Sequence, residues 1–237
     1  MTLLFISLLF ASCAILPTPD NPSSRRGSDK TAAKKSSAET DTAGSSQRKS
    51  AKEVEDIKKK LIEGAALYRG ARNLIVRDKR FNMDCSGTIA AIYYYAGIDL
   101  QKYYPDYTGT GTERVYQILN DRKLIKKTWL PEPGDIIFWD NTFDLNKNNK
   151  DDDLLTHMGM VVSADKNGNI TYIHYHNSLG IVYEVMNIRK KNTHREIVAG
   201  RSIVVNSPMR MKDGNRGNKP WLSGQLVNSF GEAYHLD

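Results

Sequence analysis

The chain has 237 residues, 40% of them hydrophobic, and carries a formal net charge of +7. This length allows one large domain, or one ordinary domain with additional segments, and the hydrophobic fraction is sufficient for a buried core. With only two cysteines, the chain has no disulfide framework. Its basic residues are not interleaved with aromatic ones in a pattern that indicates nucleic-acid binding, so we expect no nucleic-acid partner.

Residues 1–13 are typical of an export signal. The apolar run over residues 3–10 carries no charge, is too short to span a bilayer and fits the apolar core of a signal peptide. It ends in Phe10-Ala11-Ser12-Cys13, which resembles the lipobox of bacterial lipoproteins. This resemblance implies lipidation of Cys13, export, and attachment to a membrane of the cell envelope. An ordinary signal peptide that is cleaved nearby is the alternative.

Residues 14–52 have the composition of a disordered linker. They are rich in Ser, Thr, Ala, Lys and Pro and contain too few large apolar residues to fold. Eight basic and four acidic side chains give this segment a charge of +4. We expect the linker either to lie against anionic lipid headgroups or wall polymers, or simply to be solvated.

Three helices are expected in the first half of the folded part, over residues 53–69, 88–97 and 112–120. In the first, apolar residues recur every three or four positions, which predicts an amphipathic helix. The second follows Cys85; Asp84 or Ser86 is its candidate cap, and Gly97 is suited to ending it. Thr112 is the candidate cap of the third. Irregular segments are expected at residues 71–83 and 99–111.

The second half of the folded part is expected to consist of strands, at residues 136–139, 157–163, 170–176, 181–188 and 197–205. Residues 165–169 predict a hairpin turn between the second and third strands. Helices followed by an antiparallel meander indicate an α+β domain, with the helices packed on the sheet. We place this domain at residues 53–205. The tail at residues 206–237 cannot be placed from its sequence.

Cys85 is a candidate nucleophile. A helix start has unpaired N–H groups and a partial positive charge, which favour a thiolate over a thiol. In an exported protein Cys85 is also an unpaired thiol in an oxidising compartment, where it invites oxidation unless it has a use. A buried structural cysteine is the alternative, because free cysteine is among the most buried residue types.

The candidate base is a histidine. His157 begins one strand and His174 lies on the neighbouring strand across the hairpin, so the two side chains can touch, because directly opposed residues lie about 5 Å apart. His176 is on the same face of its strand as His174 and competes with it as the group that orients the base. We expect His194 and His235 to be surface residues.

Four motifs occur in order: Asp84-Cys85-Ser86-Gly87, Pro133-Gly134-Asp135-Ile136-Ile137-Phe138, His157-Met158-Gly159-Met160-Val161 and Tyr172-Ile173-His174. In residue type, order and approximate spacing, residues 53–188 resemble the NlpC family of papain-like cysteine peptidases, which cleave bacterial cell-wall peptides. The resemblance implies a papain-like fold with Cys85 as nucleophile, His157 as base and His174 as the orienting residue. It also implies hydrolysis of an amide between γ-D-glutamyl and a diamino acid of the peptidoglycan stem, through an acyl-enzyme and without a cofactor.

Two other functions remain open. An N-acetylmuramoyl-L-alanine amidase of the related CHAP type would share the cysteine and the histidine and differ mainly in the groove. A catalytically weak lipoprotein would use the same groove to hold peptidoglycan. The second alternative is motivated by residues 72–75, which replace the Tyr and Gly that the family usually has before the nucleophile; Tyr68 is a possible substitute for that Tyr.

A candidate calcium loop lies between the first two predicted strands. Its spacing follows the first part of a calcium loop, in which alternate oxygen ligands converge on one cation. Asn149 stands at the usual glycine position, and Leu155 stands where a bidentate glutamate is expected. A polar surface loop explains the same residues. The candidate ligands of a structural Ca²⁺ are Asp144, Asn146, Asn148 and Asp152.

Overall fold

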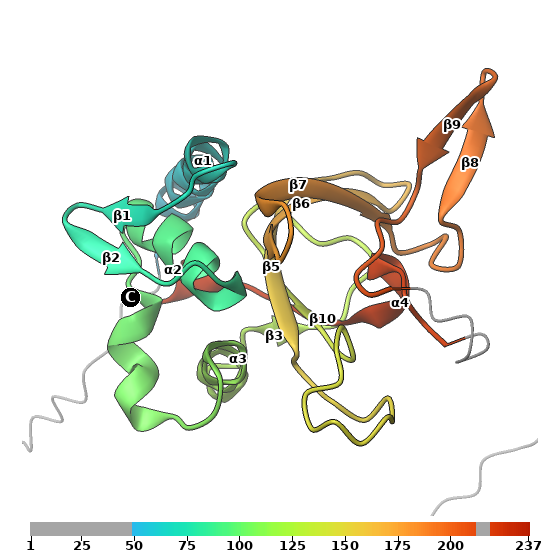
Figure 1. Cartoon of the computed structure of the whole chain (residues 1–237). Helices are drawn as coiled ribbons and strands as arrows, with labels where there is room; N and C mark the ends of the chain where they lie inside the picture. The colour runs from blue at the N-terminus through green and yellow to red at the C-terminus, as the bar shows by residue number, and fades with distance from the viewer. Residues whose placement is uncertain (1–48, 212–218) are drawn as a thin grey trace, which may run out of the picture. The chain divides into compact units, whose positions relative to one another are not determined.

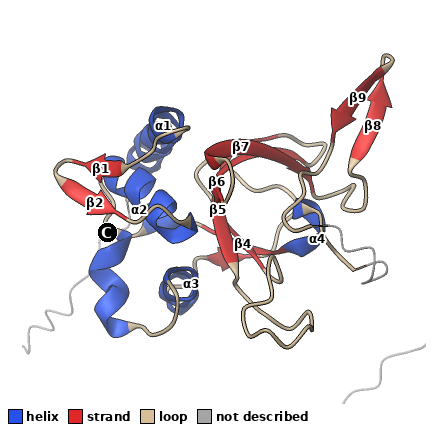
Figure 2. Cartoon of the chain, viewed as in Figure 1, coloured by secondary structure: helices blue, strands red, loops and turns tan. Residues whose placement is uncertain are grey.

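The computed structural model describes residues 49–211 and 219–237 (Figure 1). The predicted export signal, Cys13 and nearly all of the predicted linker lie outside these residues. Helices and an antiparallel sheet are both present, which confirms the α+β class. The longer helices come first in the chain and most of the strands follow, as the colours of Figure 1 show. Figure 2 distinguishes the helices from the strands in the same view.

Helix α1 spans Ala51–Tyr68 and begins two residues before the predicted start. The reason is a capping box at Ser50. The Ser50 side chain accepts a hydrogen bond from the Glu53 N–H, and the Glu53 carboxylate accepts one from the Ser50 N–H at 2.7 Å. These bonds satisfy N–H groups that the first turn of a helix leaves unpaired. The helix therefore begins at Ala51, and Glu53, the predicted first residue, is its third.

Helix α2 spans Cys85–Tyr95, so the cysteine is its first residue. Of the two candidate caps, Asp84 is the one used, and its Oδ1 accepts from the Gly87 N–H at 2.7 Å. Gly97 follows the helix with a φ of +98° and ends it as predicted. Most of α2 is buried, which fixes the position of Cys85 at its partly buried start.

Helix α3 spans Gly111–Asp121, and its cap is Thr110 rather than the predicted Thr112. The Thr110 hydroxyl accepts from the Glu113 N–H at 3.3 Å. Thr112 is instead the second residue of the helix, and its side chain is buried. The loop expected before this helix contains a short 3₁₀ helix, η1, over Leu100–Asp106.

Four strands lie where they were expected: β4 (Ile136–Trp139), β5 (His157–Ala164), β6 (Asn169–His176) and β7 (Gly180–Asn187). They pair as antiparallel neighbours in chain order. Two further strands complete the sheet, β3 (Ile125–Lys126) and β10 (Val227–Gly231). The order is β3-β10-β4-β5-β6-β7. The sheet is therefore not a simple meander, because a strand from the tail pairs with β4.

Two small hairpins differ from expectation. Residues 71–83 contain β1 (Leu74–Val76) and β2 (Lys79–Phe81). The single strand expected at residues 197–205 is a separate hairpin of β8 (Arg195–Val198) and β9 (Arg201–Val204), which projects from the sheet in Figure 1. The tail also forms the short helices α4 (Ser223–Leu226) and η3 (Ala233–His235).

The sheet has a hydrophobic core on each face. Because strand side chains alternate between faces, Ile136 and Phe138 pack with the helices while Ile137 and Trp139 pack into a second core with Phe230 of β10. This explains the uninterrupted apolar run of β4, which is buried on both faces. No helix in the two described ranges is long and apolar enough to cross a membrane.

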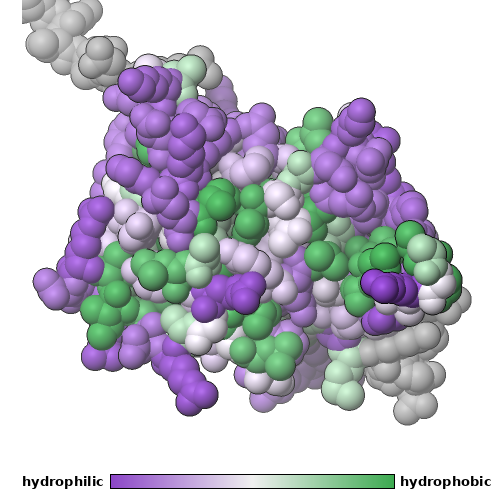
Figure 3. Space-filling model, turned by 90° about the horizontal axis from the view of Figure 1, so that it is seen from above, coloured by the Kyte–Doolittle hydropathy of each residue, from purple (hydrophilic) through white to green (hydrophobic). Residues whose placement is uncertain are grey.

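Hydrophobic side chains also reach the surface. On the β8–β9 hairpin, Ile197 and Ile203 are 72% and 47% exposed. The face drawn in Figure 3 shows hydrophobic residues gathered at several places among hydrophilic ones.

Candidate active site

A pocket of about 700 Å³ lies where α2 begins beside the start of β5. Its lining includes Cys85 from α2, His157 from β5, and His174 and His176 from β6. The fold thus brings together the four residues that the sequence predicts as nucleophile, base and candidate orienting groups.

The turn before α2 holds Cys85 in place. The Asp84 carboxylate accepts hydrogen bonds from the Gly87 N–H and from the Ser86 hydroxyl, the latter at 2.9 Å. A Cβ at residue 87 would collide with the carbonyl oxygen of Asn82, so this close approach requires glycine. Cys85 and Ser86 both line the pocket and belong to the first turn of the helix, whose N–H groups have no partner within the helix.

The Cys85 thiol is in contact with α3. Its Sγ lies 3.7 Å from Oγ1 of Thr112, a residue that the sequence predicts only as a helix cap. Burial raises the pKa of the thiol, and the nearby Asp84 charge raises it further, against the lowering effect of hydrogen bonds from Thr112 and from the Met158 and Ser86 main chain. The Ser86 N–H at the helix start thus acts in the expected direction, but desolvation outweighs it and the pKa of the thiol is raised.

The two predicted histidines are in direct contact. His157 Nε2 and His174 Nδ1 are 2.9 Å apart, with the rings in an edge-on arrangement. Gly159 is paired with His174 in the sheet, so His174 lies diagonally across from His157. His176 has another use, since its Nδ1 accepts hydrogen bonds from the Ser178 and Leu179 N–H groups of the following turn.

His157 is electrically neutral in this environment. Burial of the ring, with smaller contributions from His174 and His176, lowers the pKa of His157 to about 3. Its Nε2 is occupied by His174, so Nδ1 is the ring nitrogen that remains for a second partner. The described residues show no hydrogen bond between His157 and the Cys85 thiol. The resting site is therefore a neutral thiol beside a neutral imidazole.

Two residues beyond His174 complete this arrangement. Glu184 of β7 places Oε2 3.2 Å from His174 Nε2, and the Tyr172 hydroxyl donates to the same oxygen at 3.1 Å. The distance between His174 Nε2 and Glu184 Oε2 is within hydrogen-bond range, but Nε2 of His174 makes no aligned hydrogen bond. Sequence reasoning missed Glu184. A single acidic residue in an otherwise apolar strand was the available signal, because buried carboxylates need partners.

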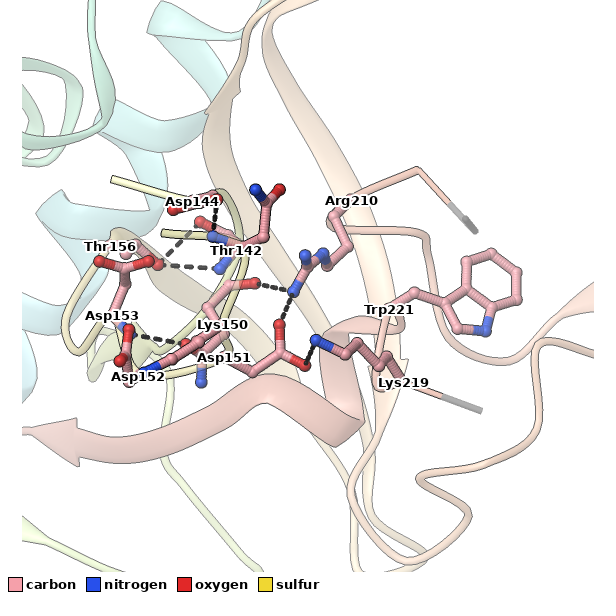
Figure 4. Close-up of polar contacts among 12 residues, drawn as sticks. Thr142, Asp144, Lys150, Asp151, Asp152, Asp153, Thr156, Arg210, Lys219 and Trp221 are labelled. Carbon is pink, nitrogen blue, oxygen red and sulfur yellow. Dashed lines mark hydrogen bonds and ion pairs between the residues drawn. The ribbon is translucent and has the colours of Figure 1, made fainter. Parts of the chain in front are cut away.

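Two loops line the pocket together with α2: residues 140–156, between β4 and β5, and residues 205–211, which follow β9. Thr142 and Thr156 close the first loop, with the Thr142 N–H donating to the Thr156 hydroxyl at 2.9 Å. Arg210 of the second loop donates to Asp151 of the first at 2.9 Å, and Lys219 approaches the other oxygen of that carboxylate at 3.3 Å (Figure 4). Ion pairs thus tie the two loops together.

The mouth of the pocket carries exposed apolar side chains, among them Phe143, Leu154 and Met211. Tyr103, Tyr104 and Tyr107 pack against the helical core and do not line this pocket. Tyr68, the suggested substitute in the altered wall, stacks on Tyr95 of α2.

The remaining histidines are not at this site. His194 was expected at the surface but is partly buried, because its Nδ1 bonds the Asn206 carbonyl at 2.9 Å and its ring packs on Trp221. His235 is also partly buried and packs on Tyr234.

The candidate calcium ligands lie together in the first of the two loops, residues 140–156. Asn148 and Asn146 both donate side-chain hydrogen bonds to Asp152, and Asp144 accepts from the Asn148 and Asn149 N–H groups. Asn149 has a φ of +61°, the left-handed conformation expected at its position. Within residues 49–211 and 219–237, this loop included, no group of three or more His, Cys, Asp or Glu side chains is placed to hold a metal ion.

The chain was also compared with known proteins. No protein-family model matches it, and no curated protein matches it in sequence.

Proposed function

We propose that this protein is a cysteine hydrolase of bacterial cell-wall peptides with a papain-like architecture. The observation that supports this most strongly is the shared pocket, in which Cys85 at a helix start faces a strand carrying His157 in contact with His174. A nucleophile, a base and a group that orients the base are the parts that cysteine hydrolases need. The four motifs that resemble the NlpC family contribute these same residues.

In the proposed reaction, Cys85 begins as a thiol, as its raised pKa implies. Nδ1 of His157 takes the thiol proton as Sγ attacks the amide carbonyl of the stem peptide. The N–H groups of Cys85 and Ser86 are the donors that would stabilise the oxyanion. His157 then returns the proton to the leaving amine and an acyl-enzyme forms. Water, deprotonated by His157, cleaves the thioester and releases a carboxylic acid and the thiol.

Digestion of purified cell-wall sacculi, followed by mass spectrometry of the released fragments, tests the proposal. We expect wild-type protein to release fragments with a new amine on the diamino acid. We expect Cys85→Ala and His157→Gln to release none, since each removes a group that moves the proton. His194→Gln is the matched control, because this histidine lies outside the pocket. If wild-type protein releases nothing from several wall types, the hydrolase proposal fails.

The same fragments separate the alternatives. Release of intact stem peptides with a free L-alanine amine would identify an N-acetylmuramoyl-L-alanine amidase. Binding to sacculi that is equal in wild type and Cys85→Ala, with no fragments from either, would identify a wall-binding lipoprotein.

We also propose that Cys13 carries a lipid anchor and that the protein acts in the cell envelope. Metabolic labelling with a fatty acid should mark the wild-type protein and leave Cys13→Ala unlabelled. An unlabelled wild-type protein would leave an ordinary cleaved signal as the explanation of residues 1–13.

A structural Ca²⁺ in the loop of Asp144, Asn146, Asn148 and Asp152 is a further proposal, and catalysis as written requires no cofactor. The left-handed Asn149 supports it. The hydrogen bonds among the side chains would have to be exchanged for cation contacts. Calorimetry with Ca²⁺ should give a binding heat that Asp144→Asn reduces. Absence of both a heat and a melting-temperature change with EDTA would remove the cation from the proposal.

A further inference from the structure

We propose that Glu184 is a positioning residue that selects the tautomers of both site histidines. It lies on β7, outside the motifs that identify Cys85, His157 and His174. Its side chain is only 15% exposed, and its Oε2 is 3.2 Å from Nε2 of His174. The inference extends the proposed function, because it concerns how the proposed base is kept ready to accept a proton.

The contact between the histidines admits two arrangements. In one, His157 Nε2–H donates to His174 Nδ1; in the other, His174 Nδ1–H donates to His157 Nε2. The 2.9 Å distance fits both. The two arrangements differ in which ring nitrogens outside this contact carry a hydrogen. In the first arrangement, the Nδ1 of His157 is an unprotonated acceptor; in the second it carries a hydrogen and cannot take one from a thiol.

Glu184 distinguishes these arrangements. An ionised carboxylate only accepts hydrogen bonds, so it favours the tautomer of His174 that has its hydrogen on Nε2. That tautomer leaves His174 Nδ1 as an acceptor, which in turn places the hydrogen of His157 on Nε2. The Nδ1 of His157 is then the free base. Glu184 thus sets the tautomer of His157, the proton acceptor for Cys85, through the ring of His174.

The surroundings of Glu184 support this role. The sheet register pairs Glu184 with Tyr172, and the Tyr172 hydroxyl donates to Oε2. This hydroxyl fixes the carboxylate without contacting the hydrogen-bonding nitrogens of His157. His174 is 2% exposed, so water is largely excluded from competing for its Nε2. Within the described residues, Glu184 is the one acidic partner recorded for that nitrogen.

Nitrogen NMR of the histidine rings tests the inference without any substrate. Near neutral pH, we expect the wild-type spectrum to show hydrogen on Nε2 of both His157 and His174. In Glu184→Leu, which cannot accept a hydrogen bond, the Nδ1–H forms should become populated. In Glu184→Gln, whose amide oxygen still accepts, the wild-type pattern should persist. Identical spectra for wild type and Glu184→Leu, with the protein folded, would overturn the inference.

The kinetics of cell-wall peptide hydrolysis supply the second measurement. We expect Glu184→Leu to lower kcat about 100-fold, the scale of a lost general base, with KM unchanged. Glu184→Gln should recover most of this loss. Glu196→Leu is the matched control: it makes the same substitution on β8, at a carboxylate that pairs with Lys190 and lies outside the pocket of Cys85, and we expect kcat to be unchanged. Equal losses in the Leu and Gln variants of Glu184 would contradict tautomer selection.

The two proposals fail separately. If wild-type protein cleaves nothing but the tautomers still depend on Glu184, the hydrolase proposal fails and the positioning role stands. If the wild type cleaves wall peptides and Glu184→Leu does so at the same rate, the positioning role fails alone.

Discussion

At the scale of single residues, the site combines groups whose environments oppose one another. Cys85 lies at a helix start, which favours the thiolate, but burial and Asp84 act in the other direction and raise its pKa. His157 is kept neutral by the same burial. The proposed reaction therefore depends on proton transfer during attack rather than on a preformed ion pair.

The alkylation rate of Cys85 measures this state directly, because only the thiolate reacts. We expect the rate with iodoacetamide to be low near neutral pH and to rise with pH through and above the ordinary value of 9.0, since the pKa is raised. A Cys13→Ser background leaves Cys85 as the reacting thiol. A rate already at its plateau in neutral solution would reveal an ion pair instead.

Gly87 is expected to tolerate no side chain. In Gly87→Ala the new Cβ would collide with the Asn82 main chain, which cannot rotate away as a side chain can. We expect a loss of about 1–3 kcal/mol in the free energy of unfolding, measured by denaturant titration, as for other overpacked sites. Gly64→Ala in α1 is the control, because its Cβ would meet only the side chains of Tyr95 and Ile92, at 3.0 Å or more. Equal effects of the two substitutions would show that the collision with the Asn82 main chain adds no cost.

At the scale of elements, β10 is the unexpected member of the sheet. It pairs with β3 on one side and β4 on the other, and it carries Phe230 into the second core. The tail is therefore part of the sheet that positions His157, since β4 pairs directly with β5.

Truncating the side chain in this strand should be costly. Phe230 is 1% exposed, and we expect Phe230→Ala to lower the free energy of unfolding by about 3–5 kcal/mol, as for other buried aromatic residues. Ile197→Ala, at a side chain 72% exposed on the β8–β9 hairpin, should change it by no more than about 0.5 kcal/mol. Chemical denaturation of both variants is the measurement. Similar values would mean that β10 contributes little to the core.

The elements that could be predicted from the sequence are those with a clear periodicity or turn. Helix α1 has a clear periodicity, α2 ends at Gly97, and a hairpin turn joins β5 to β6. The short strands β1, β2 and β3 span two or three residues, too few to show a period of two. The sequence around β10 does not indicate which strands it pairs with, because those strands are distant in the chain.

The residues of the candidate site likewise fall into those that the sequence predicts and those that it does not. Cys85, His157 and His174 could be found from motif order, and the hairpin explains why the two histidines meet. Thr112 and Glu184 could not, since each is brought to the site by packing between elements rather than by a motif. Electrostatics was the least predictable part: the helix position of Cys85 is visible in the sequence, but the degree of its burial is not.

At the scale of the whole molecule, the neutral His157 links stability to pH. Its folded-state pKa of about 3 lies below the ordinary 6.5, so the unfolded chain binds a proton more readily. The contribution is fully present above the unfolded value and is lost as pH falls from 6.5 toward 3. We expect the wild type to lose more stability over this range than His157→Gln, compared by thermal unfolding. Parallel curves for the two proteins would contradict a buried neutral imidazole.

The position of β10 also sets the order in which the domain can be completed. The side chain of Asn228, in β10, donates to Asp140, the residue that follows β4, across a separation of 88 residues. Translation adds about 5–20 residues per second, so β4 is made roughly 4–18 s before the strand that pairs with one of its edges. For that time β4 offers four apolar side chains and an unpaired edge to other chains. We therefore expect the nascent chain to be most prone to aggregation until synthesis has passed Gly231.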